Sequence, residues 1–302
     1  MSGQIRNCLY GLLVCLPWAA EAAVSLQSGV LVDPDSARVW LTHPDSAVEQ
    51  VNVASGRTEW RSALAALPMA VGEQSVLALR EGAERGTLDY AVLARLDGQP
   101  VALDQLPLPG AVRALVEARL GERFDLKTVD GGLRWTYRRE LPQGALLDAD
   151  ASAQKSGDAP QQGSLAIDWS RQRLQVVPDA ALKASAELPA EIGAPTADGP
   201  RTFRSVSDLY RLRSERQKDG RYRWQISAVR GGVLGELYSD YSYRPFEVVG
   251  DVVLYVRPFE VQAANGEARV IESTLVAYDL GAGKSAWTRT LRDLDYHGPY
   301  PP

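Results

Sequence analysis

The hydrophobic and polar positions of this chain alternate over short runs, and most runs end in a turn that contains glycine. Residues 87–96 form one such run and are followed by Asp97-Gly98. Residues 163–169 form another, which is followed by a second run over 173–177. Alternation over about four to eight residues predicts half-buried β-strands, and Asp-Gly predicts a tight hairpin turn. We therefore expect consecutive antiparallel hairpins.

The second half of the chain continues the same pattern. Strands are expected over 208–214, 221–229, 233–238 and 250–259. The first three are separated by Asp219-Gly220 and Gly231-Gly232, which favour turns. Because strands recur along the whole chain, the sequence predicts an all-β fold.

One turn pattern occurs near both ends of the chain, in residues 48–60 and 273–287. Alignment of Trp60 with Trp287 also pairs Gly56 with Gly283, Arg57 with Lys284 and Asn52 with Asp279. An Asn or Asp side chain can bond the amides of a turn, and glycine supplies a positive φ at little cost. A tryptophan at the start of the next strand can pack on a neighbouring sheet. The two copies therefore predict a repeated sheet module.

This pattern resembles the PQQ-like propeller repeat, which reads roughly Ala-x-Asp-x-x-Thr-Gly-Lys-x-x-Trp. The later copy matches at Ala277, Asp279, Gly283, Lys284 and Trp287, with Ala282 in place of the threonine, and the earlier copy keeps Ser55, Gly56, Arg57 and Trp60. The resemblance implies a β-propeller, and ~40–50 residues per blade predict about five to six blades. A β-sandwich of two stacked sheets would show the same hairpins and is the alternative.

One apolar stripe has the period of a helix. Pro109 suits a first helical turn and Gly121 suits a C-terminal cap. The stripe between them consists of Val112, Leu115, Val116 and Leu120, and we expect one short packing helix here. Two stretches without apolar periodicity, 148–163 and 184–201, are predicted to be long surface loops.

The N-terminus has the pattern of a secretory signal. Arg6 precedes an apolar stretch over residues 8–18, and Ala20-Glu21-Ala22 offers the small-x-small pattern of a cleavage site. We expect a signal peptide over 1–22 and a single exported domain over 23–302, periplasmic or secreted. No later segment reaches the roughly 20 apolar residues of a membrane-spanning helix.

Both cysteines of the chain, Cys8 and Cys15, lie in this signal. The exported domain would then have no disulfide, thiolate metal site or cysteine nucleophile. Lipid attachment at Cys15 is disfavoured because Val14 precedes it, where lipoprotein processing resembles a signal that requires a small residue.

Charge and residue types exclude several kinds of chemistry. The net charge of -5 gives no electrostatic reason to bind nucleic acid. The two histidines, His43 and His297, are too few for a typical zinc site, and each adjoins proline or glycine, as turn residues do. No phosphate-binding loop, dinucleotide fingerprint or Gly-x-Ser-x-Gly elbow is present. A calcium loop starting at Asp148 fails, since Ala153 and Ala159 replace the required glycine and glutamate.

The resemblance also reaches the quinoprotein dehydrogenases, which hold pyrroloquinoline quinone and calcium at the centre of about eight blades of ~40 residues each. About 280 residues after the signal are too few for that number of blades. The vicinal cysteine pair that stacks on the quinone is also absent. We therefore expect no cofactor and no metal.

An acidic and aromatic stretch provides a candidate ligand site. Its residues are Tyr238, Asp240, Tyr241, Tyr243 and Arg244. Tyrosine offers a flat apolar face and a hydroxyl, which suit sugars or peptides. The alternative is an ordinary strand edge, because tyrosine is common in strands. The tail 293–302 is rich in proline and tyrosine and is predicted to be a disordered end, with a docked strap as the alternative.

The leading functional hypothesis is a non-catalytic binding or scaffold protein of the cell envelope, whose partner is an envelope protein or a small ligand. A propeller offers a broad rigid face with loops that are free to bind. The PQQ-like family includes outer-membrane assembly scaffolds, so the resemblance implies such a role. The alternatives are a carboxylate-based hydrolase or lyase, for which no acid–base pair stands out, and a carbohydrate or peptide sensor that uses the tyrosines.

Overall fold

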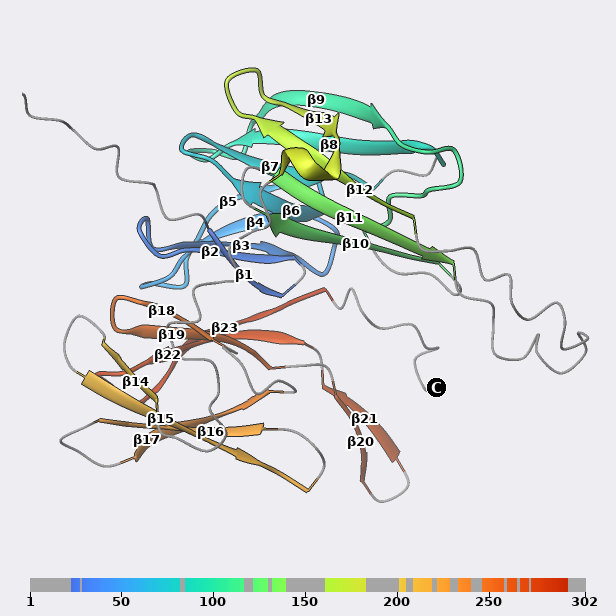
Figure 1. Cartoon of the computed structure of the whole chain (residues 1–302). Coiled ribbons are helices and arrows are strands. Elements are labelled where there is room, and N and C mark those ends of the chain that lie inside the picture. The colour runs from blue at the N-terminus through green and yellow to red at the C-terminus, as the bar shows by residue number, and fades with distance from the viewer. Residues whose placement is uncertain are drawn as a thin grey trace, which may run out of the picture.

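Nearly all of the described chain is β-structure. The computed structural model describes residues 23–27, 29–81, 85–116, 122–129, 132–139, 161–182, 201–204, 209–218, 222–228, 233–239, 246–257, 260–264, 267–271 and 273–292. Their strands form five antiparallel sheets of four or five strands and one two-stranded ribbon (Figure 1). Within these residues, no helix is both long enough and apolar enough to span a membrane.

Each large sheet is a meander of successive strands, and we refer to the sheets as blades 1 to 5 in chain order. Blade 1 contains β1 (Val24–Gln27), β2 (Val30–Asp33), β3 (Arg38–Thr42), β4 (Val48–Asn52) and β5 (Thr58–Ser62). Blade 2 contains β6 (Leu67–Val71), β7 (Ser75–Leu79), β8 (Thr87–Ala94) and β9 (Pro100–Pro107). Blade 3 contains β10 (Glu122–Val129), β11 (Gly132–Arg139), β12 (Gln161–Asp168) and β13 (Arg173–Val177).

The remaining strands form the last two blades. Blade 4 contains β14 (Arg201–Arg204), β15 (Leu209–Arg216), β16 (Tyr222–Ala228) and β17 (Val233–Ser239). Blade 5 contains β18 (Phe246–Val249), β19 (Val252–Arg257), β22 (Thr274–Asp279) and β23 (Lys284–Thr290). The ribbon of β20 (Glu260–Ala264) and β21 (Glu267–Ile271) is inserted between β19 and β22, and a single 3-10 turn, η3, spans Asp179–Ala181.

Four apolar cores between neighbouring blades set the order of the blades in space. Trp224 and Val253 join blades 4 and 5, Val39 and Leu275 join blades 5 and 1, Trp40 and Val76 join blades 1 and 2, and Tyr90 and Trp135 join blades 2 and 3. The order is therefore 4-5-1-2-3. Blade 5, from the end of the chain, lies against blade 1, from its start, as a ring of blades requires.

The prediction of an all-β propeller fold is confirmed, with five blades in the described residues. Meandering sheets that pack face to face are the architecture of a propeller, whereas a sandwich has two sheets. Among the described strands, none of blade 3 packs extensively against one of blade 4. The blades therefore form an arc, with blade 3 in the upper half of Figure 1 and blade 4 at the bottom.

The predicted helix over 109–121 is wrong in its described part. Residues 109–116 have no helical turn, although Val112, Leu115 and Val116 are buried in the core between blades 2 and 3. The backbone pairs instead with the turn before β8, where Gly86 N donates to Val112 O at 2.7 Å. The apolar spacing thus predicted the burial of these side chains correctly. The backbone, however, is hydrogen-bonded to a segment distant in sequence and not within a helix.

Two predicted loops and the predicted signal fall mostly outside the described residues. In the first loop, residues 161–163 already belong to β12, and in the second only Arg201 is described, as the first residue of β14. Residues 1–22 lie outside the described part of the chain. The signal peptide, the loops and the single-domain boundary stay predictions.

Candidate functional site

The two aligned turns have the same geometry. Gly56 and Gly283 adopt φ values of 66° and 65°. Asn52 Oδ1 accepts the amide of Ser55 at 3.0 Å, and Asp279 Oδ1 accepts the amide of Ala282 at 2.9 Å. The side chain therefore closes the turn and glycine supplies the left-handed residue in both copies.

The aligned tryptophans have the same surroundings as well. The Trp287 ring covers Gly56, so that a Cβ at Gly56 would lie 2.4 Å from the ring, and Trp287 Nε1 donates to Val53 O at 2.7 Å. The Trp60 ring covers Gly98 in the same way, at 2.5 Å, and Trp60 Nε1 donates to Arg95 O at 2.8 Å. Each tryptophan therefore docks on the glycine turn of the next blade, which is the rotational relation that the repeat predicted.

The Asp97-Gly98 turn of blade 2, which the sequence predicted after the run 87–96, is a third copy of the same turn. Gly98 has a φ of 69°, and its amide donates to Ala94 O at 2.9 Å, as the amide of Gly56 donates to Asn52 O. The tryptophan position of this copy is Ala102. On blade 3 the matching glycine position is Gln172, with a φ of 55°. The tryptophan and the glycine that it would cover are thus both missing from the contact between blades 2 and 3.

A partly buried ion pair connects the turns of blades 1 and 2. Arg95 Nη2 donates to Asp33 Oδ2 at 2.7 Å, Arg95 Nη1 donates to Gly72 O at 2.9 Å, and its guanidinium lies 5.1 Å from the Trp40 ring centroid. Burial alone would raise the pKa of Asp33, but hydrogen bonds from Ser36 and Arg95 outweigh it and lower the pKa. Both carboxylate oxygens of Asp33 and both terminal nitrogens of Arg95 are hydrogen-bonded, which indicates a structural role.

A second polar cluster lies where blade 1 meets blade 5. Glu49 is 4% exposed, accepts from the Thr58 hydroxyl and lies 3.7 Å from Arg289 Nε. At the adjacent turn, Asp45 contacts His43 Nδ1 at 2.6 Å and pairs with Arg61. Burial and the Arg61 guanidinium lower the pKa of His43. Since Asp45 is itself neutralised by Arg61, the imidazole is neutral at neutral pH.

The carboxylates of both clusters are occupied by positively charged or imidazole side chains. Asp33 faces Arg95, Glu49 faces Arg289, and Asp45 contacts His43. Within the described ranges, no group of three or more His, Cys, Asp or Glu side chains could hold a metal ion. His43 lies at a turn, as predicted, and His297 lies outside the described residues.

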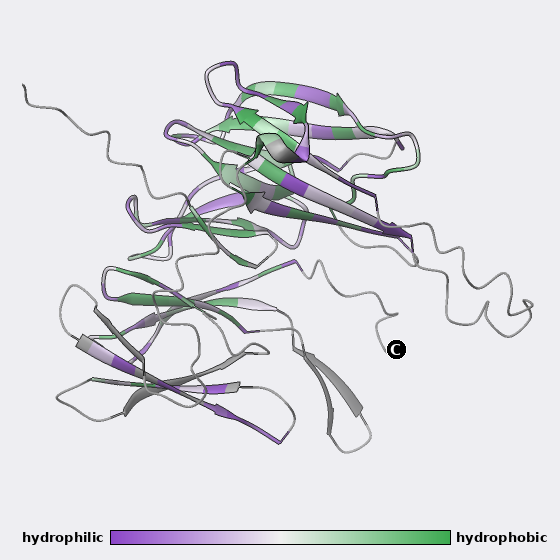
Figure 2. Cartoon of the chain, in the orientation of Figure 1, coloured by the Kyte–Doolittle hydropathy of each residue, from purple (hydrophilic) through white to green (hydrophobic). Residues whose placement is uncertain are grey.

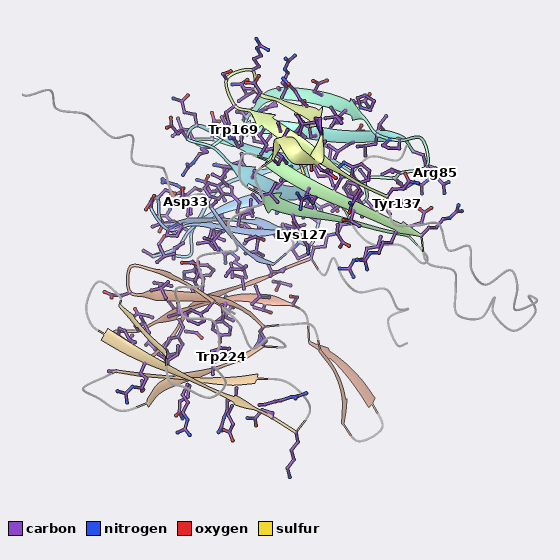
Figure 3. All side chains as sticks on the ribbon, in the orientation of Figure 1. Asp33, Arg85, Lys127, Tyr137, Trp169 and Trp224 are labelled. Carbon is purple, nitrogen blue, oxygen red and sulfur yellow. The ribbon has the colours of Figure 1, made fainter. Side chains whose placement is uncertain are left out.

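A small pocket opens among residues of blades 1, 2 and 3. Its volume is about 150 Å³, and it is lined by Ala23, Leu31, Met69, Ala70, Val71, Thr128, Val129, Gly132, Ile167 and Trp169. The one hydroxyl in this lining, Thr128 Oγ1, already donates to Met69 O at 3.1 Å. The Trp169 ring forms one wall and covers Gly72 (Figure 3). The pocket could accept an apolar group, but it presents no polar group for catalysis.

The most unusual surface is the outer edge of blade 2. β9 pairs only with β8, and its side chains Val101 and Leu103 are 43% and 48% exposed. Leu96, in the turn before it, is 89% exposed. Natural edge strands usually carry charges that discourage pairing, as the outer strands β5 and β23 do. Of the eight residues of β9, only Asp104 is charged.

The tyrosine-rich candidate site cannot be assembled from the described residues. The backbone of Tyr238 lies in β17 and pairs with Arg223 of β16. Asp240, Tyr241, Tyr243 and Arg244 lie outside the described residues, as does the tail 293–302. The ligand role of this stretch stays a prediction. The edge strand β9 was missed because the sequence analysis placed no strand over 100–107; the absence of Lys and Arg from this segment was the available signal.

Comparison with known proteins gives only loose structural similarity. No family model matches the chain, and no curated protein matches it. Among solved structures it is similar to BamB from Moraxella catarrhalis, with 13% identity over 87% of this chain and 63% of that chain and a TM-score of 0.23. It is also similar to a europium-containing methanol dehydrogenase (11% identity, 84% and 67% covered, TM-score 0.23) and to the WD40 repeats of RRP9 (8% identity, 91% and 84% covered, TM-score 0.25). The chain spans less than two thirds of BamB, and superpositions this loose carry no functional information.

Proposed function

We propose that this chain is a non-catalytic binding protein of the cell envelope that captures an extended segment of a partner protein at β9. The observation that carries the proposal is the open edge of β9, with Val101 and Leu103 exposed and no basic side chain along the strand. Long apolar edges are avoided in natural proteins unless a partner covers them. The envelope location rests on the signal pattern of residues 1–22 and is proposed with the function.

Strand addition fits the local geometry of β9. Its inner side pairs with β8, and no described strand pairs with its outer side, where the Gln105 amide already donates to Asp104 Oδ1 at 2.8 Å. Val101 is the extra residue of a bulge opposite Val92 and Leu93. Leu103 lies on the face opposite to Ala102 and Leu106, which pack toward the core shared with blade 3. A partner strand would gain main-chain hydrogen bonds at the edge and apolar contacts on one face.

A site-specific crosslink tests this proposal. A photoreactive amino acid at Leu103 is expected to capture one discrete envelope protein, and the double substitution V101K/L103K, with the probe moved to Gln105, should abolish the adduct because it places charges on the open edge. The matched control is V176K on β13, another outer strand, where Val176 is 59% exposed. The proposal is wrong if the adduct survives V101K/L103K, or disappears equally in V176K, while circular dichroism shows all variants folded.

A further inference from the structure

Asp104 is the one charged residue of the edge strand β9, and its carboxylate is bonded only to uncharged groups. Oδ1 accepts from the Gln105 amide at 2.8 Å, and Oδ2 accepts from the Tyr90 hydroxyl at 3.2 Å. Asp104 is exposed, and it has no ion-pair partner among the described residues. Figure 2 shows a hydrophilic band in the ribbon of β9, which is otherwise mainly apolar, and the sequence of the strand assigns this band to Asp104 and Gln105.

The bond to Gln105 closes part of the edge that a new strand would use. In an antiparallel strand, alternate residues direct their amides to the same edge, so Leu103 shares the outer edge with Gln105. The series ends at Pro107, which has no amide, and it begins in the bulge at Val101. Leu103 and Gln105 therefore supply the outer amides of the regular part of β9, and the Asp104 side chain occupies one of the two.

The other oxygen of Asp104 is held from the neighbouring blade. Tyr90 is buried, and its hydroxyl accepts the Leu174 amide of β13 at 3.1 Å while it donates to Asp104 Oδ2. A hydroxyl has one proton to donate, and the Leu174 amide leaves that proton for Asp104. Oδ1 is thus the oxygen that can change partners, because its donor, Gln105, belongs to the exposed edge.

We propose that the segment captured at β9 carries a lysine or arginine that binds Asp104, so that Asp104 selects basic partner segments. This inference rests on the proposed strand addition and names the chemistry of its partner. When the partner strand pairs, one of its carbonyls accepts from the Gln105 amide, and its cation donates to the Asp104 oxygen that this amide releases. One hydrogen bond within β9 is exchanged for two with the partner, one of which is charge-assisted.

The charge of the surrounding segment favours the same partner. Residues 96–109 contain no lysine or arginine, so a partner cation meets no like charge along β9. A neutral partner would pair with Gln105 and leave the Asp104 carboxylate without that donor, which lowers the net gain. An acidic partner would add repulsion between carboxylates. The expected order of affinity is therefore basic, neutral, acidic.

Three synthetic peptides test this assignment by fluorescence anisotropy. Each is a labelled seven-residue chain of alternating valine and threonine, whose central threonine is replaced by lysine, glutamine or glutamate. The valines then lie on one face and the central residue on the other, as Leu103 and Asp104 do. The lysine peptide should bind the wild-type protein about tenfold more tightly than the glutamine peptide, because it gains one charge-assisted hydrogen bond. D104N, which keeps an acceptor for Gln105 but has no charge, should remove this preference.

Two further variants separate the hydrogen bond from the charge. D104A frees the Gln105 amide, so the glutamine peptide should bind D104A about threefold more tightly than the wild type. D97N is the matched control, since it removes a nearby acid whose carboxylate accepts from the Gln99 amide within the turn. It should change each Kd less than twofold. Circular dichroism verifies that each variant is folded.

The outcomes distinguish this inference from strand addition itself. Equal binding of the lysine and glutamine peptides to the wild type, or a preference that survives D104N, overturns the role of Asp104 and leaves strand addition in place. An equal loss of preference in D97N also overturns it, because general attraction would then explain the effect, as does weaker binding of the glutamine peptide to D104A. If no peptide binds the wild type or D104A, strand addition at β9 is wrong and this inference is wrong with it.

Discussion

At the scale of single residues, charge and burial act together between neighbouring blades. Asp33 is 7% exposed and shares its carboxylate among the amides of its own turn, Ser36 and Arg95. The Arg95 guanidinium also bonds the backbone of Gly72 and lies over Trp40, so one arginine connects the turns of two blades. Removal of the acid would leave this guanidinium partly buried without its counter-charge, which costs more than an exposed ion pair contributes.

The stability of this contact should depend on pH. Because the folded-state pKa of Asp33 is lowered, its contribution is present above the unfolded pKa near 3.8 and is lost as pH falls through the folded pKa. We expect D33N to lower the free energy of unfolding by about 2 kcal/mol at pH 7 and by progressively less as pH falls below about 3.8. Urea denaturation across that range measures the difference. D35N, at an exposed position of the same turn, is the control; equal costs for D33N and D35N would contradict the prediction.

At the scale of elements, the fold depends on the docking of a tryptophan on a glycine turn. Trp287 covers Gly56 and Trp60 covers Gly98, and in both pairs the indole also bonds a backbone carbonyl of the covered turn. Blade 2 has Ala102 in place of the tryptophan, and blade 3 has Gln172 in place of the glycine. A turn that no indole covers has room for a side chain. The absence of a tryptophan at Ala102 and of a glycine at Gln172 therefore concerns the same contact, between blades 2 and 3.

Position 56 therefore requires glycine for two reasons, its positive φ and its contact with the Trp287 ring. A second glycine, which shares only the positive φ, distinguishes the two effects. Gly250 also has a positive φ, of 61°, but no atom lies within 4 Å of the Cβ that a substitution would add. We expect G250A to cost only the left-handed backbone conformation, about 1 kcal/mol, and G56A to cost about 3 kcal/mol because the methyl group displaces Trp287. Denaturation midpoints and tryptophan fluorescence check this. Equal costs at both sites would mean that the indole is not docked.

At the scale of the whole molecule, the blades differ in how many of their faces are buried. In blades 1, 2 and 5 the middle strands β4, β7 and β22 are buried at nearly every position. In blades 3 and 4 buried aromatic residues such as Trp135 and Trp224 alternate with arginines such as Arg213. The first pattern is typical of a sheet covered on both sides and the second of a sheet covered on one side. The described outward positions of blades 3 and 4 at the ends of the arc are thus mainly polar, with Val176 of blade 3 as an exposed apolar exception.

This arrangement predicts a gradient of local stability. Amides of β4, β7 and β22 should exchange with solvent only through global unfolding, whereas those of blade 4 should also exchange through local opening, because buried and exposed or half-buried positions alternate along β16 of that blade. Hydrogen exchange measured by mass spectrometry would place blade 4 peptides at least about tenfold faster than blade 1 peptides. Blade 4 amides as slow as those of β4 would contradict the arc.

The sequence by itself determined the class of fold and the equivalence of its two end modules. Both depend on local physics: alternation with a period of two selects strands, and glycine, a turn-closing acid or amide, and tryptophan at a constant spacing select one kind of turn. Only the tertiary structure decided that 109–116 forms no helix, that Gly98 receives Trp60, and that β9 is an outer edge strand. Those outcomes depend on partners distant in the chain, such as Gly86 for Val112 and Trp60 for Gly98, and no local pattern specifies such a partner.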